Sequence, residues 1–151
     1  MPNTRRASAL LRIAGTASLA IALLYVGCAI AGGESYYWFG TGMELSKLAA
    51  RGSPWPPVVA LALALAFVVF ALYPWSATGI GPRVPRLRTG LVIITAMYLL
   101  RGEPLVRACF GLPIFPAAPE HRYVVFTIVA FAIGLVHLAA VISNWRSLER
   151  A

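Results

Sequence analysis

The stretch LRTGLVIITAMYLLRGEPLVR, residues 87–107, decides the fold, because it is an apolar run that is interrupted by charge. Between Arg88 and Arg101 lie about 12 uncharged residues, whereas a helix that crosses a membrane needs about 20. If this segment crosses, it carries Arg101 into one end of the bilayer, with Glu103 close behind. An ionised side chain is costly there unless it is paired or reaches water. One charge must therefore be accommodated at a defined depth.

The composition predicts an integral membrane protein. The chain has 151 residues, of which 60% are hydrophobic and 12% are charged, and its mean hydropathy is +0.77. Soluble domains of this length do not reach such values. The net charge of +8 would suggest nucleic-acid binding in a soluble chain, but here the basic residues stand at the ends of apolar runs. Membrane lipids are therefore the expected surroundings, and nucleic acid is not an expected partner.

Four apolar segments predict an all-α fold, an integral membrane bundle of four antiparallel transmembrane helices that forms one domain over residues 1–151. The predicted spans cover about 10–32, 57–75, 87–106 and 122–144. The first span could instead be a cleaved signal peptide, because Ala29-Ile30-Ala31 resembles a cleavage site. Its uncharged run is longer than the 7–15 residues of a signal core, which favours a retained helix. Pro56 and Pro57 can open the second span, since the N–H groups of a first helical turn have no helical partner.

The connections on one side of the bundle predict an outer cap made from the loops 34–57 and 102–122. Four consecutive aromatic residues, Tyr36 to Phe39, are typical of a membrane interface. Residues 43–51 predict a short helix along the surface. The second loop is rich in proline and carries further charges.

The distribution of basic residues predicts that both termini are cytoplasmic. With that orientation, eight arginines lie inside against one acid, Glu149: Arg5, Arg6, Arg12, Arg83, Arg86, Arg88, Arg146 and Arg150. The outer side holds five basic residues that four glutamates nearly neutralise, as the positive-inside rule requires. Arginine supplies twelve of the thirteen basic residues, and alanine, glycine and proline are abundant, which fits a GC-rich bacterial genome. The expected location is a bacterial inner membrane.

Arg101 is the first candidate binding residue. One hypothesis is a site for an anion or a lipid headgroup, or a charged element of a substrate path. The favoured interpretation is a half-buried ion pair with Glu34, Glu44 or Glu103, which would fix an outer loop onto the bundle. Trp38, in the aromatic loop, is a further candidate contact.

His137 is the ionisable residue that lies deep in a predicted span. It shares a helix face with Gly134 and other small residues, which predicts close helix packing. A hydrogen bond from His137 to Ser18 or Thr95 is the favoured interpretation. A proton relay or a ligand site is the alternative. A haem site is not expected, because the other histidine, His121, belongs to the outer boundary.

No catalytic residue, cofactor site or metal site is identified. Cys28 and Cys109 are both expected near the outer side, where a disulfide could form, although free cysteines are favoured. The chain has no Cys-x-x-Cys motif for thiol redox chemistry. Its five acidic residues all fall outside the apolar runs, which argues against a proton-coupled exporter of the small four-helix type.

Three segments together resemble a group of small bacterial four-helix membrane proteins of uncharacterised function: Tyr36-Tyr37-Trp38-Phe39-Gly40-Thr41-Gly42, Ala50-Arg51-Gly52-Ser53, and Tyr98-Leu99-Leu100-Arg101-Gly102. The resemblance implies no activity, but it points to the aromatic loop and the Arg101 stretch. The expected function is that of a non-enzymatic accessory or binding subunit that contacts a protein or lipid partner, or a second copy of the chain. The alternative is a small transporter or lipid-handling protein that uses His137 and the Arg101, Glu34 and Glu44 set. A lipid-modifying enzyme ranks third.

Overall fold

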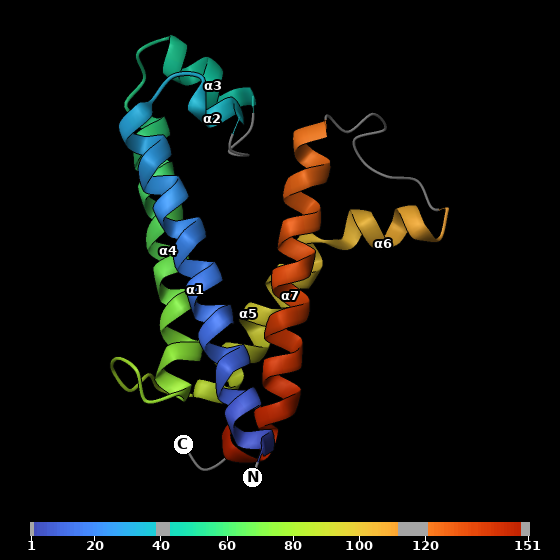
Figure 1. The fold of residues 1–151 in the computed structure, drawn as a ribbon. Coiled ribbons are helices and arrows are strands. Elements are labelled where there is room, and N and C mark those ends of the chain that lie inside the picture. Colours follow the sequence, from blue (N-terminus) through green and yellow to red (C-terminus); the bar gives the residue numbers. More distant parts are fainter. Residues whose placement is uncertain (1, 39–42, 112–120, 149–151) are drawn as a thin grey trace.

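The structure, a computed structural model, describes residues 2–38, 43–111 and 121–148 (Figure 1). Every regular element in these residues is a helix, which confirms the predicted all-α class. In chain order the helices are α1 (Pro2–Ala31), α2 (Ser35–Trp38), α3 (Met43–Ala50), α4 (Trp55–Ala77), α5 (Leu87–Arg101), α6 (Glu103–Cys109) and α7 (His121–Leu148). α1 begins and α7 ends at one end of the molecule, called the terminal end here, and α2 and α3 lie at the opposite end, called the cap end.

Among the described residues, three helices contain stretches that are long and apolar enough to cross a membrane: Ser8–Ala31, Trp55–Ala77 and Val124–Trp145. They correspond to three of the four predicted spans. The segment predicted as a span over 87–106 forms only the 15-residue helix α5. Pro104 cannot donate the backbone hydrogen bond that would continue α5, and the chain restarts as α6 after Gly102. At about 22 Å, α5 is shorter than the roughly 30 Å hydrocarbon core of a bilayer, so the fourth span stays a prediction.

α1 packs against α4 through small residues. Both helices bury small side chains at helical spacing: Ala14, Ser18 and Ala22 on α1, and Ala60, Ala64 and Ala71 on α4. At Gly15 a Cβ atom would lie only 2.5 Å from the indole ring of Trp75. Small residues let helix backbones approach closely, which is the usual basis of helix association in membranes.

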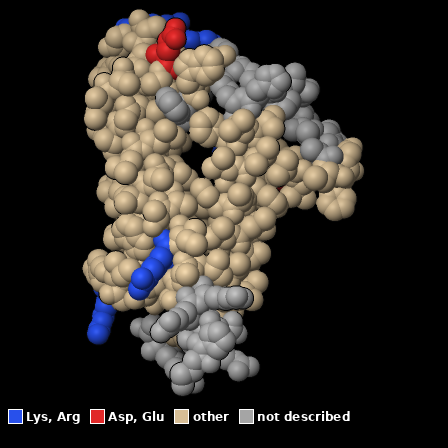
Figure 2. Space-filling view, in the orientation of Figure 1, with Lys and Arg blue, Asp and Glu red and all other residues tan. Residues whose placement is uncertain are grey.

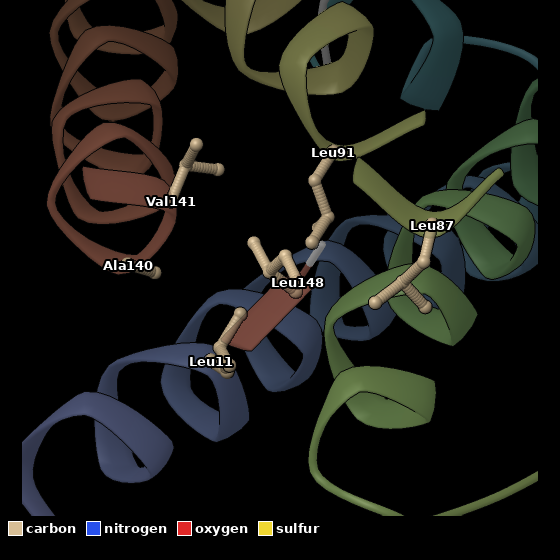
Figure 3. Close-up of a cluster of buried hydrophobic side chains, with 6 residues drawn as sticks. All are labelled: Leu11, Leu87, Leu91, Ala140, Val141 and Leu148. Atoms are coloured by element: carbon tan, nitrogen blue, oxygen red, sulfur yellow. The ribbon is translucent and has the colours of Figure 1, made fainter. Parts of the chain in front are cut away.

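α5 packs against α7, and Gly134 is a point of close approach. A Cβ atom at Gly134 would lie 2.9 Å from Cδ2 of Leu99 and 3.1 Å from its backbone nitrogen, which confirms the close-packing role predicted for this face. The guanidinium carbon of Arg88 lies 3.5 Å from the centre of the Trp145 ring, a cation–π contact between the same two helices. Near the terminal end, α1, α5 and α7 converge on a cluster of buried side chains (Figure 3): Leu11, Leu87, Leu91, Ala140, Val141 and Leu148.

The first half of the predicted cap folds into α2 and α3 beside the ends of α1 and α4 (Figure 1). α3 confirms the short helix predicted over 43–51. Tyr36 is only 1% exposed and packs with Cys28 and Ala60, so its side chain faces the protein rather than the surroundings. This burial raises the pKa of the Tyr36 hydroxyl. Trp38 is 58% exposed, as an interfacial residue would be, and Phe39 lies outside the described residues.

The second half of the predicted cap is described only in part. α6 turns away from α5 and contacts α7. Residues 112–120 lie outside the described residues.

Candidate functional site

A cavity of about 260 Å³ lies where α7 diverges from α1 and α4, on the cap side of the hydrophobic cluster. Helices α1, α4, α5 and α7 each supply part of its wall. The ring-bearing and charged side chains among the lining residues are Tyr25, Phe67, Phe70, Tyr98, Arg101 and Phe126. Figure 2 shows the molecule hollowed between the α1–α4 side and the α7 side.

Four rings form one side of the cavity, called the aromatic wall here: Tyr25, Phe67, Phe70 and Tyr98. Phe67 contacts the other three. Its ring stacks on Tyr25 of α1, with the ring centroids 5.6 Å apart and the ring planes within 8° of parallel. It also meets Phe70 edge-on at 5.6 Å and lies 6.1 Å from the ring of Tyr98. Each aromatic pair adds about 0.5–1.5 kcal/mol beyond its burial, so one face of the cavity is held by rings from three helices.

Tyr98 joins α5 to both α1 and α7. Its hydroxyl lies 3.0 Å from the hydroxyl of Ser18, and both groups are buried. On another side its ring lies 5.0 Å from the ring of His137, with 32° between the planes. Tyr98 also lines the cavity, whereas His137 does not appear among the lining residues. The Tyr98 ring therefore separates His137 from the cavity, and this side of the cavity is called its floor.

His137 is 1% exposed and does not make the hydrogen bond predicted with Ser18 or Thr95. The Ser18 hydroxyl is bonded to Tyr98, and the Thr95 hydroxyl donates to the carbonyl of Leu91 at 2.7 Å. The Nδ1 atom of His137 lies 3.1 Å from the carbonyl oxygen of Ile133. A carbonyl can only accept, so Nδ1 carries the proton in the neutral ring and Nε2 is the lone-pair nitrogen.

Two buried polar atoms within residues 2–38, 43–111 and 121–148 have no hydrogen-bond partner there: Nε2 of His137 and Oγ1 of Thr127. Both residues belong to α7, and an unmet polar group costs about 1–3 kcal/mol. The helix that borders the cavity therefore carries unmet polar atoms.

Arg101 lies at the cavity wall, and its depth is fixed by its neighbour. A Cβ atom at Gly102 would lie 2.5 Å from the Phe131 ring, so the end of α5 packs directly against the middle of α7. Phe131 is seven residues inside the apolar stretch Val124–Trp145, about 10 Å from the end of that stretch at 1.5 Å per residue. The depth of Arg101 in a membrane stays a prediction.

Two of the three glutamates predicted as partners of Arg101 pair with other basic residues. Glu44 pairs with Lys47 on α3 at 2.9 Å, and Glu103 pairs with Arg107 on α6. Glu34 is exposed in the turn after α1. The hydrogen bond and the charge of Lys47 lower the pKa of Glu44. Two of the predicted partners, Glu44 and Glu103, are thus engaged by basic residues of their own helices.

The two cysteines are free, as the sequence favoured, with Cys28 buried and Cys109 exposed. Within the described part of the chain, no group of three or more His, Cys, Asp or Glu side chains is close enough to hold a metal ion. The cavity instead offers aromatic surface and the side chain of Arg101. These groups can bind and orient a ligand.

The aromatic wall was missed by sequence reasoning, although the sequence carries a signal for it. Phe67 and Phe70 are three residues apart, as are Tyr98 and Arg101, and this spacing places each pair on one helix face. A charged or ring-bearing pair that shares a face of an apolar helix could have been read as the wall of a site.

No protein-family model, no curated protein and no solved structure matches this chain.

Proposed function

We propose that this chain is a small multi-pass protein of a bacterial inner membrane, with four antiparallel crossing helices and cytoplasmic termini, that binds part of a lipid-like molecule without catalysing a reaction. The observation that carries this proposal is the cavity of about 260 Å³ with an aromatic wall and one arginine. Ligand sites are typically concave and mostly apolar, with a few polar groups that orient the ligand.

The charges support the proposed orientation. In Figure 2, basic side chains stand without acidic ones toward the terminal end, whereas acidic and basic side chains occur together at the cap end. Cytoplasmic segments carry the excess of arginine and lysine, which favours a cytoplasmic terminal end. The arginine-rich composition is the support for a bacterial source.

The fourth crossing is supported by the path of the chain. α4 ends at the terminal end, and α7 begins at the cap end (Figure 1). The segment between them must return across the molecule, and α5 covers about 22 Å of that distance.

A binding role has more support than a transport role. On α1, α5 and α7 the buried residues Leu11, Leu91 and Val141 lie closer to the terminal end than the residues that line the cavity. His137 lies behind the ring of Tyr98, and Glu34 and Glu44 are at the surface. A path through this set would have to open the packed half of the molecule, whereas binding needs only the cavity that is present.

The test is native mass spectrometry of the protein extracted from its own membrane in a mild detergent. Ala130 lines the cavity, so Ala130→Phe should fill it. Ala132 is exposed on the same helix, so Ala132→Phe is the matched control for the added ring. We expect a small molecule or lipid to stay with the wild type and with Ala132→Phe, and to be lost from Ala130→Phe.

Equal retention by all three proteins would contradict a site in the cavity. A wild-type chain that retains a second polypeptide and no small molecule would replace the binding proposal with a role as an accessory subunit.

A further inference from the structure

In a bilayer, the competing occupants of the cavity are the acyl chains of the surrounding lipid. The lining takes ring-bearing residues from all three stretches that are apolar enough to cross a membrane, among them Tyr25, Phe67 and Phe126. Lipid tails are as apolar as leucine, so an alkyl chain gains little free energy when it leaves lipid for an apolar cavity. A ligand that the cavity selects must therefore make a contact that lipid tails do not make.

Aromatic rings supply such a contact. Within the aromatic wall, the rings touch one another in both geometries that aromatic pairs prefer. Tyr25 and Phe67 are stacked with their planes within 8° of parallel, whereas Phe67 and Phe70 meet edge-on at 77°. Both arrangements depend on the charge distribution of a π-system. A saturated chain has no such distribution, so it cannot add to the series.

A fifth ring lines the same cavity from another helix. Phe126 belongs to α7, and within the described residues no ring contact joins it to the aromatic wall. Met97 of α5 also lines the cavity, and a thioether sulfur makes favourable contacts with aromatic rings. A ring that enters the cavity thus has aromatic partners on both its α4 side and its α7 side.

The size of the cavity limits how much of a ligand it can hold. Its volume of about 260 Å³ corresponds to roughly nine water molecules at about 30 Å³ each. This is room for a single ring and the first part of its tail. The remainder of a lipid-sized molecule must lie outside the cavity.

From these observations we infer that the ligand is a membrane-soluble molecule with an aromatic ring at the end of an apolar tail, and that the ring occupies the cavity against the aromatic wall and Phe126. This inference rests on the proposed binding function and adds the chemical class of the ligand. The tail interacts with lipid much as it does with apolar side chains. The ring therefore provides the selectivity, and a purely aliphatic molecule is not the preferred ligand.

The experiment compares three neutral hydrocarbons with the same number of carbon atoms: dodecylbenzene, dodecylcyclohexane and octadecane. They differ in whether one end is an aromatic ring, a saturated ring or a chain. The protein is reconstituted in phosphatidylcholine nanodiscs with isotope-labelled methionine methyl groups. NMR follows the methyl signal of Met97, which lines the cavity and is assigned by its loss in Met97→Leu. The midpoint of each titration gives the affinity of the probe.

We expect dodecylbenzene to reach its midpoint at a lower mole fraction than the other two probes. An aromatic pair adds about 0.5–1.5 kcal/mol beyond its burial, which converts to about two- to twelvefold in affinity. The preference over dodecylcyclohexane, which has the same carbon skeleton, should therefore be about twofold or more.

Two variants locate the preference. Phe67→Leu removes the ring that contacts the other three of the aromatic wall and keeps an apolar side chain, so it should lower the preference for dodecylbenzene. Phe110 is 76% exposed and lies outside the cavity lining, so Phe110→Leu is the matched control and should keep the wild-type preference. If Phe67→Leu does not fold, the comparison of the three probes on the wild type still decides the class of the ligand.

The possible failures are distinguishable. A saturable Met97 response with equal midpoints, or with a lower midpoint for either saturated probe, would refute the aromatic ring and leave the cavity as a binding site. The same preference in Phe67→Leu and the wild type would refute the place of the ring at the aromatic wall.

The absence of a saturable response is read together with the retention of the native ligand. No response to any probe, while Ala130→Phe still loses the ligand that the wild type retains, would refute the ring class alone. No response together with identical behaviour of Ala130→Phe and the wild type would refute the proposed binding function itself.

Discussion

The hydroxyl of Tyr98 on α5 lies 3.0 Å from the hydroxyl of Ser18 on α1, although the two residues are 80 positions apart in the chain. This buried bond ties the two helix pairs together at the floor of the cavity. The same Tyr98 ring lies over His137, so one side chain connects three helices.

Removing this bond should destabilise the protein by a modest and non-additive amount. We expect Tyr98→Phe and Ser18→Ala to show a coupling energy of about 0.5–1.7 kcal/mol in a double-mutant cycle, the range found for hydrogen bonds between membrane helices. The measurement is equilibrium unfolding in mixed micelles. Strictly additive losses would mean that the two hydroxyls do not interact.

A single methyl group should distinguish a tight helix contact from an open one. Gly134→Ala places a Cβ atom 2.9 Å from Leu99, and we expect it to cost about 1–3 kcal/mol of unfolding free energy. Gly27→Ala on α1 is the control, because nothing lies within 4 Å of its added Cβ. The control should be neutral or slightly stabilising, by up to about 1 kcal/mol, since alanine favours a helix more than glycine does. Equal changes in unfolding free energy for the two variants would contradict the close packing of α5 on α7 at Gly134.

The burial of Tyr36 should make the cap sensitive to alkaline pH. A tyrosine in an unfolded chain has a pKa of about 10, and burial raises the pKa of Tyr36 above that value. The stability contributed by the neutral hydroxyl is present below pH 10. It is lost as the pH rises further, because the unfolded chain then releases the proton more readily than the folded one.

Thermal unfolding between pH 8 and pH 11 would measure this effect. We expect the wild type to lose more stability over this interval than Tyr36→Phe, which has no hydroxyl to titrate. Parallel pH profiles for the two proteins would argue against a buried Tyr36 hydroxyl.

The two cysteines should differ in reactivity. A maleimide reagent should label exposed Cys109 in the folded protein and spare buried Cys28, and both should react after denaturation. Mass spectrometry of Cys28→Ala and Cys109→Ala separates the two sites. Labelling of Cys28 at the same rate as Cys109 in the folded state would contradict its packing with Tyr36 and Ala60.

The sequence predicted the elements whose causes are local. The apolar lengths that define α1, α4 and α7 are visible in the chain, as are Pro56 and Pro57 in the first turn of α4. The end of α4 was less well predicted, because Pro74 stands inside the helix and the chain remains helical to Ala77. The short helix α3 was also predicted from its own residues.

The site was predicted only in outline. Arg101 lies at the cavity wall and His137 is buried in α7, but the hydrogen bond predicted from His137 to Ser18 or Thr95 is not formed. Glu44 and Glu103 bond to basic residues three and four positions away, because such neighbours are always within reach on a helix. A pairing of Glu44 with Arg101, by contrast, would have depended on how the loop between α1 and α4 folds.

By itself, the sequence determined where helices form and which segments are apolar enough to enter a membrane, because hydrophobic length and proline position act within a few residues. Only the tertiary structure decided that Ser18 meets Tyr98, that Tyr36 is buried and that Arg101 faces an aromatic cavity. These contacts depend on the rotation and depth of each helix relative to its neighbours. Close approaches such as Gly134 on Leu99 and Gly102 on Phe131 set that rotation and depth, and they join residues that are far apart in the chain.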